Sequence, residues 1–454
     1  MKRRNFIQKA LGAAMAQVTL GGLSFQIRAT PSAWLTARAA AANDNILVII
    51  QLSGGNDGLN MVPPLDQMSR YNTLRPTIKL AESAILPLGT TGAGLHPSMG
   101  ALKTLYDEGR MAVVQGLGYP NQSFSHFTAS KIWSIGTTDT QESTGWAGRY
   151  LNKEYPDFPA ATYTDPIALQ VQDISTTLFN SKDGLLSAAY NFDTLNNIIT
   201  KPLGTGGSGS SGGNGSSTGA CTYDNYLAYV QEQILLTDQF AGRIKTAGTL
   251  GQNAISNYPS TDLANKLKVI TKLIRGGLKT KIYHVTLGGF DTHVEQLGRH
   301  TALFTELSGA VAAFQRDLLA MGGGIADKVT TMTFSEFGRR AQENASFGTD
   351  HGTAVPMLVF GTQLNPVNMV GKSPNLNNLT DNNLPNQFDY RQSYAAYLQD
   401  WLGVSKGESD FILLQGSGSA ASSFAPLPIF RQSANPVDPC ADTKCIPATV
   451  KITD

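Results

Sequence analysis

Short apolar stretches rich in β-branched residues recur along the chain and predict buried strands. They cover residues 45–52, 111–117, 281–287, 328–334 and 355–361. Few polar residues alternate with the apolar ones, which is typical of parallel strands that are covered on both faces. We therefore expect these segments to be members of one sheet.

Segments with helical periodicity lie between these strands. Residues 302–321 place their apolar side chains on one stripe of a helix, and the stripe consists of Leu303, Leu307, Ala310, Val311, Phe314 and Leu318. Residues 223–244 and 262–274 also predict helices. Alternating strands and helices predict an α/β fold with a mostly parallel central sheet flanked by helices.

Two stretches of biased composition accompany this pattern. Residues 204–219 are almost entirely Gly and Ser, which cannot pack a core, and they predict an insert within a single domain that spans 43–423. Residues 424–454 form a Pro-rich tail. In this tail Cys440 and Cys445 are five positions apart, which predicts either a local disulfide or no special role.

The first 42 residues have the pattern of an export signal. Lys2, Arg3 and Arg4 precede a mildly apolar stretch, and a run of alanines ends the segment. This pattern is typical of a twin-arginine signal peptide, and the alternative is a basic helix that stays attached. The signal predicts a periplasmic or secreted protein whose partner in export is the twin-arginine machinery. Its removal takes away six basic residues and no acidic ones, which leaves a mildly acidic mature chain.

The composition excludes several classes of protein. Apolar residues make up 41% of the 454 positions, which supplies a sizeable core and excludes disorder as the main state. Lys and Arg number 35 against 34 Asp and Glu, so we expect no nucleic-acid partner, because phosphate binding requires a basic surplus. Beyond the N-terminal segment no run of about 18 apolar residues occurs, so no spanning helix is expected in the mature chain.

Polar residues gather directly after the predicted strands, where ligands bind in open α/β sheets. Asp57 follows the first strand, Ser125 and His126 follow the second, and Asp291 and His293 follow the third. An extended backbone puts Asp291 and His293 on one side, which suits a shared metal. The alternatives are a plain turn at Asp57 and a helix-capping role for Asp291.

The remaining candidates surround the last two strands. Glu336 and Arg339 follow the fourth strand, and the alternative is that Glu336 pairs with Arg339 or Arg340 on a helical turn. His351 precedes the fifth strand, which requires either a loop that folds back or an antiparallel strand. Adjacent extended residues point in opposite directions, so we expect His351 rather than Asp350 to reach the site.

The histidines strengthen the prediction of a metal site. Three of the six in the chain, His126, His293 and His351, lie in these loops among carboxylates. Carboxylates and imidazoles with few thiols favour divalent ions such as zinc, manganese or calcium. Of the other histidines, His96 lies in another loop and is a weaker candidate for the site. His284 and His300 are expected to be structural or surface residues.

Seven motifs lie in a fixed order within the stretch from about residue 46 to residue 402. They are GGNDGLN at 54–60, LHP at 95–97, VVQGLGYP at 113–120, SHF at 125–127, GGFDTH at 288–293, TFSEFGRR at 333–340 and GTDHGTAVP at 348–356. Their order resembles the exported bacterial family catalogued as domain of unknown function fifteen-oh-one. That family resembles the alkaline phosphatase and sulfatase superfamily in fold, which implies a dinuclear metal site at the ends of the central strands.

The resemblance also implies a role for each matching residue. The implied metal ligands are Asp57, Asp291, His293, Glu336 and His351. The implied catalytic residues are Ser125 as nucleophile with Ser123 as the alternative, His126 as ligand or proton shuttle, and Arg339 to orient the ester. The Glu at 336 and the short Asp-x-His spacing depart from the superfamily pattern. No Cys/Ser-x-Pro-x-Arg motif surrounds the serines, so a formylglycine sulfatase is not expected.

These roles predict an exported metal-dependent hydrolase of a small anionic phosphate or sulfate ester. A protein of another class fits the same motifs. This alternative is a non-catalytic exported binding or surface-assembly protein that retains the fold and part of the metal site.

Overall fold

The computed structural model describes residues 44–156, 165–171, 176–182, 184–185, 187–190, 192–200, 240–414 and 424–431. It also describes the backbone of strands β1 (Ala16–Leu20) and β2 (Leu23–Ile27), which pair antiparallel. The insert, the cysteines, most of the predicted signal and most of the helix at 223–244 lie outside the described residues. The unit that carries the candidate site comprises Asn45–Arg431, and the predicted domain boundaries stay predictions.

One large sheet forms the centre of this unit. Its strands are, in spatial order, β10 (Ala188–Tyr190), β7 (Ala168–Val171), β11 (Ile282–Leu287), β3 (Ile46–Leu52), β12 (Val329–Phe334), β15 (Val355–Phe360), β6 (Met111–Gly118) and β16 (Met369–Val370), with β17 (Phe388–Asp389) also paired to β6. All five strands predicted from the apolar stretches are present. Every residue of β6, β12 and β15 is buried, as expected for strands that are covered on both faces.

Strand direction decides which loops meet. Neighbours from β10 to β12 run parallel, whereas β15 runs antiparallel to both β12 and β6. The carboxyl ends of β11, β3, β12 and β6 and the amino end of β15 therefore share one edge. This is the antiparallel arrangement that the position of His351 requires.

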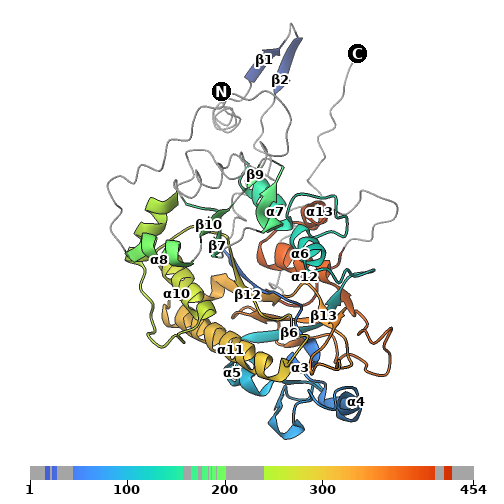
Figure 1. Ribbon diagram of the computed structural model, residues 1–454. Helices are drawn as coiled ribbons and strands as arrows, with labels where there is room; N and C mark the ends of the chain where they lie inside the picture. Colours follow the sequence, from blue (N-terminus) through green and yellow to red (C-terminus); the bar gives the residue numbers. More distant parts are fainter. Residues whose placement is uncertain are drawn as a thin grey trace, which may run out of the picture. The chain divides into compact units, whose positions relative to one another are not determined.

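Helices cover both faces of the sheet, and α5, α10 and α11 lie on one side with α6, α7, α12 and α13 on the other (Figure 1). The helices are α3 (Gly58–Met61), α4 (Met68–Leu74), α5 (Gly100–Asp107), α6 (His126–Ile135), α7 (Trp146–Glu154), α8 (Phe192–Thr200), α10 (Asp262–Arg275), α11 (Gln296–Ala320), α12 (Tyr390–Ala396) and α13 (Lys406–Ile412). Short strand pairs complete the unit, namely β4 (Leu86–Pro87) with β5 (Gly94–Leu95), β8 (Asn180–Ser181) with β9 (Gly184–Leu185), and β13 (Gly338–Arg339) with β14 (His351–Gly352). The predicted fold class, an α/β fold with a mostly parallel central sheet flanked by helices, is confirmed.

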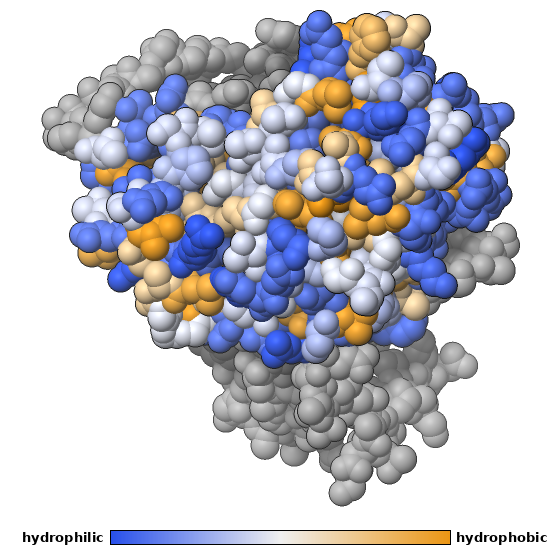
Figure 2. Space-filling model, turned by 90° about the horizontal axis from the view of Figure 1, so that it is seen from below, coloured by the Kyte–Doolittle hydropathy of each residue, from blue (hydrophilic) through white to orange (hydrophobic). Residues whose placement is uncertain are grey.

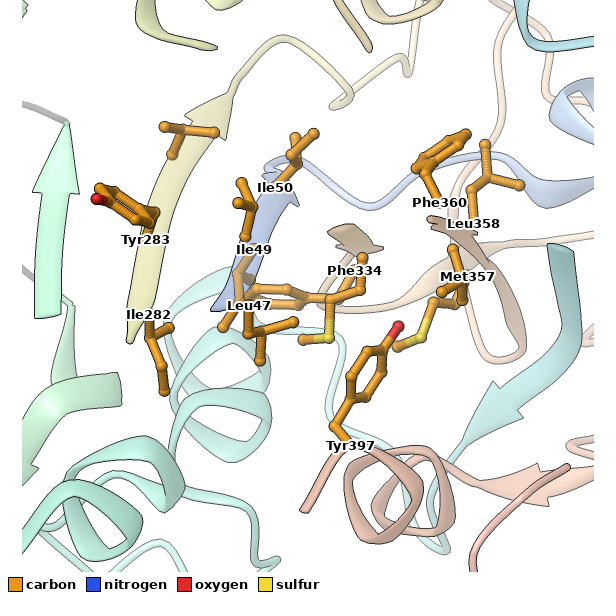
Figure 3. Packing of buried hydrophobic residues seen from close by; sticks show 14 of the residues in the cluster. Leu47, Ile49, Ile50, Ile282, Tyr283, Phe334, Met357, Leu358, Phe360 and Tyr397 are labelled. Atoms are coloured by element: carbon orange, nitrogen blue, oxygen red, sulfur yellow. The ribbon is translucent and has the colours of Figure 1, made fainter. Parts of the chain in front are cut away.

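The core lies against both faces of the central strands. Leu47 and Ile49 on β3 and Tyr283 on β11 are fully buried, and Tyr397 reaches the sheet from the helical segment that follows α12 (Figure 3). On the face shown in Figure 2, hydrophobic residues form small groups among polar ones. Within the described ranges no helix combines the length and the hydropathy that a membrane crossing needs.

Candidate metal centre

The loops that carry the candidate residues approach closely at the shared edge of the sheet. Gly54, after β3, has a φ of +124°, and a Cβ atom there would lie 2.2 Å from the backbone nitrogen of Asp291. A Cβ atom on Gly348 would lie 2.3 Å from the carbonyl carbon of His293. Only glycine fits such contacts, so these two positions allow the loops to meet.

Three imidazole rings surround the carboxylate of Asp291. The Nε2 atoms of His293 and His351 lie 3.2 Å and 3.3 Å from its Oδ1 atom, and the Nε2 atom of His126 lies 3.5 Å from its Oδ2 atom. The Nε2 atoms of His293 and His351 are 2.9 Å apart. Among the described residues, one group of side chains has ligand atoms close enough to share a metal ion, and it consists of His126, Asp291 and His351. His293 adjoins this group through the same Asp291 oxygen.

The outer nitrogen of each ring faces an oxygen acceptor. The Nδ1 atom of His351 lies 2.8 Å from the carbonyl oxygen of Phe124. The Nδ1 atom of His126 lies 2.9 Å from Oε1 of Glu336. The Nδ1 atom of His293 lies 3.3 Å from Oδ1 of Asp350. Carbonyl and carboxylate oxygens only accept, so each Nδ1 carries the proton. In the neutral rings the Nε2 lone pairs therefore face Asp291, which is the tautomer that binds metals through Nε2.

The spacing of these atoms fits one metal ion. Two donors bound to the same Zn²⁺ at about 2.0–2.1 Å in a tetrahedron lie about 3.3 Å apart. The triangle formed by Asp291 Oδ1 and the Nε2 atoms of His293 and His351 has sides of 3.2, 3.3 and 2.9 Å. Lone pairs so close to a carboxylate repel one another unless a cation lies between them. The donor set fits a divalent metal.

Burial and charge tune the groups of this cluster. Partial burial would raise the pKa of Asp291, but the hydrogen bond and charge of Arg339 bring it below the ordinary value. Partial burial lowers the pKa of His351, which favours the neutral ligand form. The side chains of Asp291 and His293 are 48% and 40% exposed, so solvent and substrate can reach the cluster.

Arg339 lies on the buried side of the cluster, away from solvent. Its fully buried guanidinium donates to Asp291 Oδ1 at 2.7 Å and to the carbonyl oxygens of Gly54, Gly55, Phe290 and Thr349. Arg339 also pairs with His351 in the β13–β14 ladder. Arg339 therefore joins three loops and holds Asp291. An ester at the surface cannot reach this guanidinium without breaking those bonds, so its predicted role in orienting the ester gains no support.

Asp57 is bonded to Arg75 instead of joining the cluster. Both side chains are fully buried, with Nη1–Oδ2 and Nη2–Oδ1 distances of 2.5 Å and 2.8 Å. The same carboxylate accepts from Gln296 and from the backbone nitrogen of Leu59 at the start of α3. Burial would raise the pKa of Asp57, yet Arg75 brings it below the ordinary value. Both oxygens of Asp57 therefore accept hydrogen bonds from groups of this chain, and its role as a metal ligand stays a prediction.

Glu336 is also placed differently from its predicted role as a ligand. Its Oε1 atom accepts from the Nδ1 atom of His126 and from the backbone nitrogen of Gly54, at 2.9 Å and 2.8 Å. Contacts of this kind orient a ligand rather than bind the metal. Glu336 pairs with neither Arg339 nor Arg340, the two alternatives that the sequence offered, because its ion-pair partner is His126 and that of Arg339 is Asp291.

The predicted nucleophile lies next to the cluster. Ser125 is an exposed N-cap residue of α6, and its hydroxyl accepts from the backbone nitrogen of Thr128 at 3.5 Å. The alternative, Ser123, uses its hydroxyl to accept from the backbone nitrogen of Ser125. His126, the next residue, brings the helix start to Asp291.

Sequence reasoning missed the residues that support the rings. Phe337 packs against His126 and His351, with ring centroids 5.0 Å and 4.4 Å apart. Its place next to Glu336 in the TFSEFGRR motif was the signal that could have identified it. Only His351 was expected to reach the site, but Asp350 also contacts it, through His293. The remaining histidines are all buried, and burial lowers their pKa values to about 4, 3 and 3, for His96, His284 and His300 respectively.

Several solved structures are distantly similar to this chain. The C-terminal periplasmic domain of EcEptC from Escherichia coli is 10% identical, with 80% of this chain and 84% of that chain covered and a TM-score of 0.36. The lipoteichoic acid synthase LtaP from Listeria monocytogenes is 10% identical, with 81% and 72% covered and a TM-score of 0.29. The PsFucS1 sulfatase from Pseudoalteromonas sp. is 8% identical, with 88% and 76% covered and a TM-score of 0.35. Likenesses this distant carry no argument about activity.

The sequence itself gives the more specific comparison. No protein of curated function matches it. Residues 222–407 match a family described as "Protein of unknown function (DUF1501)", and this segment includes the GGFDTH, TFSEFGRR and GTDHGTAVP motifs. Over residues 222–407, the match confirms the resemblance to this family that the motifs indicate.

Proposed function

We propose that this protein is an exported metal-dependent hydrolase of phosphate or sulfate esters, with one metal centre formed by His126, Asp291, His293 and His351. The observation that carries the proposal is the convergence of three Nε2 atoms on one carboxylate, with each Nδ1 atom bonded to an oxygen. A single centre replaces the predicted dinuclear site, because Asp57 is bonded to Arg75.

Each residue around this centre has a separate role in the proposed reaction. A divalent ion held there would act as a Lewis acid on an oxygen of the ester. Arg339 keeps Asp291 ionised and in place, while Glu336 fixes the ring of His126. We assign the nucleophile to Ser125, because the N-terminus of α6 stabilises a developing alkoxide and Ser125 is an exposed residue that directly precedes His126.

Elemental analysis tests the metal centre. The protein purified without its first 42 residues is expected to carry about one equivalent of zinc, manganese or calcium, and the His351→Ala variant is expected to carry much less. Asp107→Ala is the control, because Asp107 pairs with Lys103 in an exposed i,i+4 contact on α5. Absence of metal from the wild type at every loading condition would refute the centre.

A panel of chromogenic phosphate monoesters, phosphate diesters and sulfate esters tests the reaction. Activity is expected to be lost in Ser125→Ala and on chelation, and to persist in Ser123→Ala. Loss in Ser123→Ala alone would move the nucleophile to Ser123. Stoichiometric metal with no turnover on any ester would favour the second candidate, a binding or surface-assembly protein, which the full occupation of Arg339 also supports.

Export is the remaining part of the proposal. The paired Arg3 and Arg4 support transport by the twin-arginine machinery to the periplasm or the medium. A double substitution of these residues to Lys is expected to retain the full-length chain in the cytoplasm. Fractionation checks this, and unchanged export would contradict it.

A further inference from the structure

The two loops that present the metal ligands are joined by one buried amide. The side chain of Gln296 is fully buried in the first turn of α11. Its Oε1 atom accepts from the hydroxyl of Thr292 at 3.0 Å and from the hydroxyl of Thr349 at 2.6 Å. Thr292 lies between Asp291 and His293, whereas Thr349 lies two residues before His351.

Thr292 and Thr349 fix their loops to the protein interior. Both are fully buried, although Asp291 and His293 are half exposed. Alternation along an extended backbone directs Thr292 inward when its neighbours face the cluster. The backbone nitrogen of Thr349 also donates to the carbonyl oxygen of Thr292 at 3.2 Å, so the loops are paired at this point.

The other end of the amide is fixed to the buried ion pair. The Nε2 atom of Gln296 donates to Oδ2 of Asp57 at 2.5 Å, and Arg75 holds Asp57 in turn. The amide suits these contacts, because its oxygen accepts from two hydroxyls while its NH₂ group donates to a carboxylate. Glutamate at this position would face Asp57 with a second negative charge, and an apolar side chain would leave the hydroxyls without this partner.

We propose that Gln296 is a positioning residue that sets the distance between the Asp291–His293 loop and the His351 loop. This inference rests on the proposed metal centre, because its consequence is the affinity for metal. The cluster needs its donors about 3 Å apart, and they belong to loops separated by 58 residues. Outer contacts of this kind commonly change metal affinity by about 10- to 100-fold.

The experiment compares two buried glutamines of the same helix. Gln296→Met removes the amide that joins the loops, whereas Gln315→Met removes a buried amide that donates to Thr331 on β12. Zinc affinity is measured by competition with a chelating dye, and hydrogen exchange of residues 289–294 and 346–352 is measured in the metal-free protein. Gln296→Met is expected to weaken zinc binding about 10- to 100-fold and to speed exchange in both loops. Gln315→Met is expected to change neither.

A milder variant guards against a folding failure. Thr349→Val removes only one hydroxyl of the network and is expected to speed exchange in 346–352 more than in 289–294. Wild-type zinc affinity and wild-type exchange in both Gln296→Met and Thr349→Val would overturn the inference. Protein that binds zinc but hydrolyses no ester would refute the hydrolase and leave this inference standing. Exchange in the metal-free loops tests the positioning even where the wild type binds no zinc.

Discussion

Replacement of Asp57 by alanine distinguishes a metal ligand from an ion-pair partner. The sequence predicts Asp57 as a ligand, whereas the structure bonds both of its oxygens to Arg75. A lost ligand would weaken metal binding with little effect on the metal-free protein. A lost ion-pair partner would destabilise the metal-free protein, because the guanidinium of Arg75 would stay buried without its counter-charge.

The magnitude follows from the burial of both groups. Asp57 and Arg75 have no exposed surface, and the other acceptors of Arg75 are the neutral oxygens of Asn60, Arg340 and Ala341. Removal of one partner from a buried pair costs about 3–5 kcal/mol. One kcal/mol shifts the Tm of domains of 150–250 residues by about 2–4 °C and shifts larger ones less. The Tm of metal-free Asp57→Ala is therefore expected to fall by roughly 5–10 °C.

The assay is urea and thermal denaturation of the metal-free protein, followed by circular dichroism. Asp107→Ala, which removes the exposed partner of Lys103, is the matched control and is expected to cost no more than about 0.5 kcal/mol. Equal stability of Asp57→Ala and this control, together with lost metal binding, would refute the ion-pair reasoning and restore Asp57 as a ligand.

Three further predictions follow from individual side chains. Glu336→Gln keeps the shape but removes the charge that orients His126, so metal affinity measured by dye competition is expected to fall about 10- to 100-fold; unchanged affinity would contradict this. Gly348→Ala introduces a Cβ atom 2.3 Å from the backbone of His293 and is expected to reduce bound metal in elemental analysis, whereas Gly298→Ala, where a Cβ atom meets nothing within 4 Å, is expected to leave it unchanged. Burial lowers the pKa of His284 to about 3, so below pH 6.5 the unfolded chain binds a proton at this residue that the folded chain does not bind. His284 therefore lowers the free energy of unfolding by about 1.4 kcal/mol for each pH unit as the pH falls from about 6 to about 4. Denaturation at several pH values should show a shallower decline in His284→Leu, and an equal decline would contradict the assignment.

The sequence by itself determined the strands and the residues around the site. The burial of an apolar stretch such as 46–52 can be predicted from that stretch alone, because a strand covered on both faces has no polar alternation. The same reasoning placed His126, Asp291 and His293 beyond strand ends, and the topology of parallel strands brings those ends to one edge. The position of His351 also required the antiparallel direction that β15 has.

Only the tertiary structure decided the partner of each polar side chain. Asp57 is paired with Arg75, and Glu336 contacts His126, and neither contact is indicated by the motifs. The Nδ1 atom of His351 meets the carbonyl oxygen of Phe124, a residue 227 positions away. Periodicity records whether a side chain is buried, but a hydrogen bond depends on atomic distances between loops. Packing of glycines and buried amides sets those distances, and no single segment contains them.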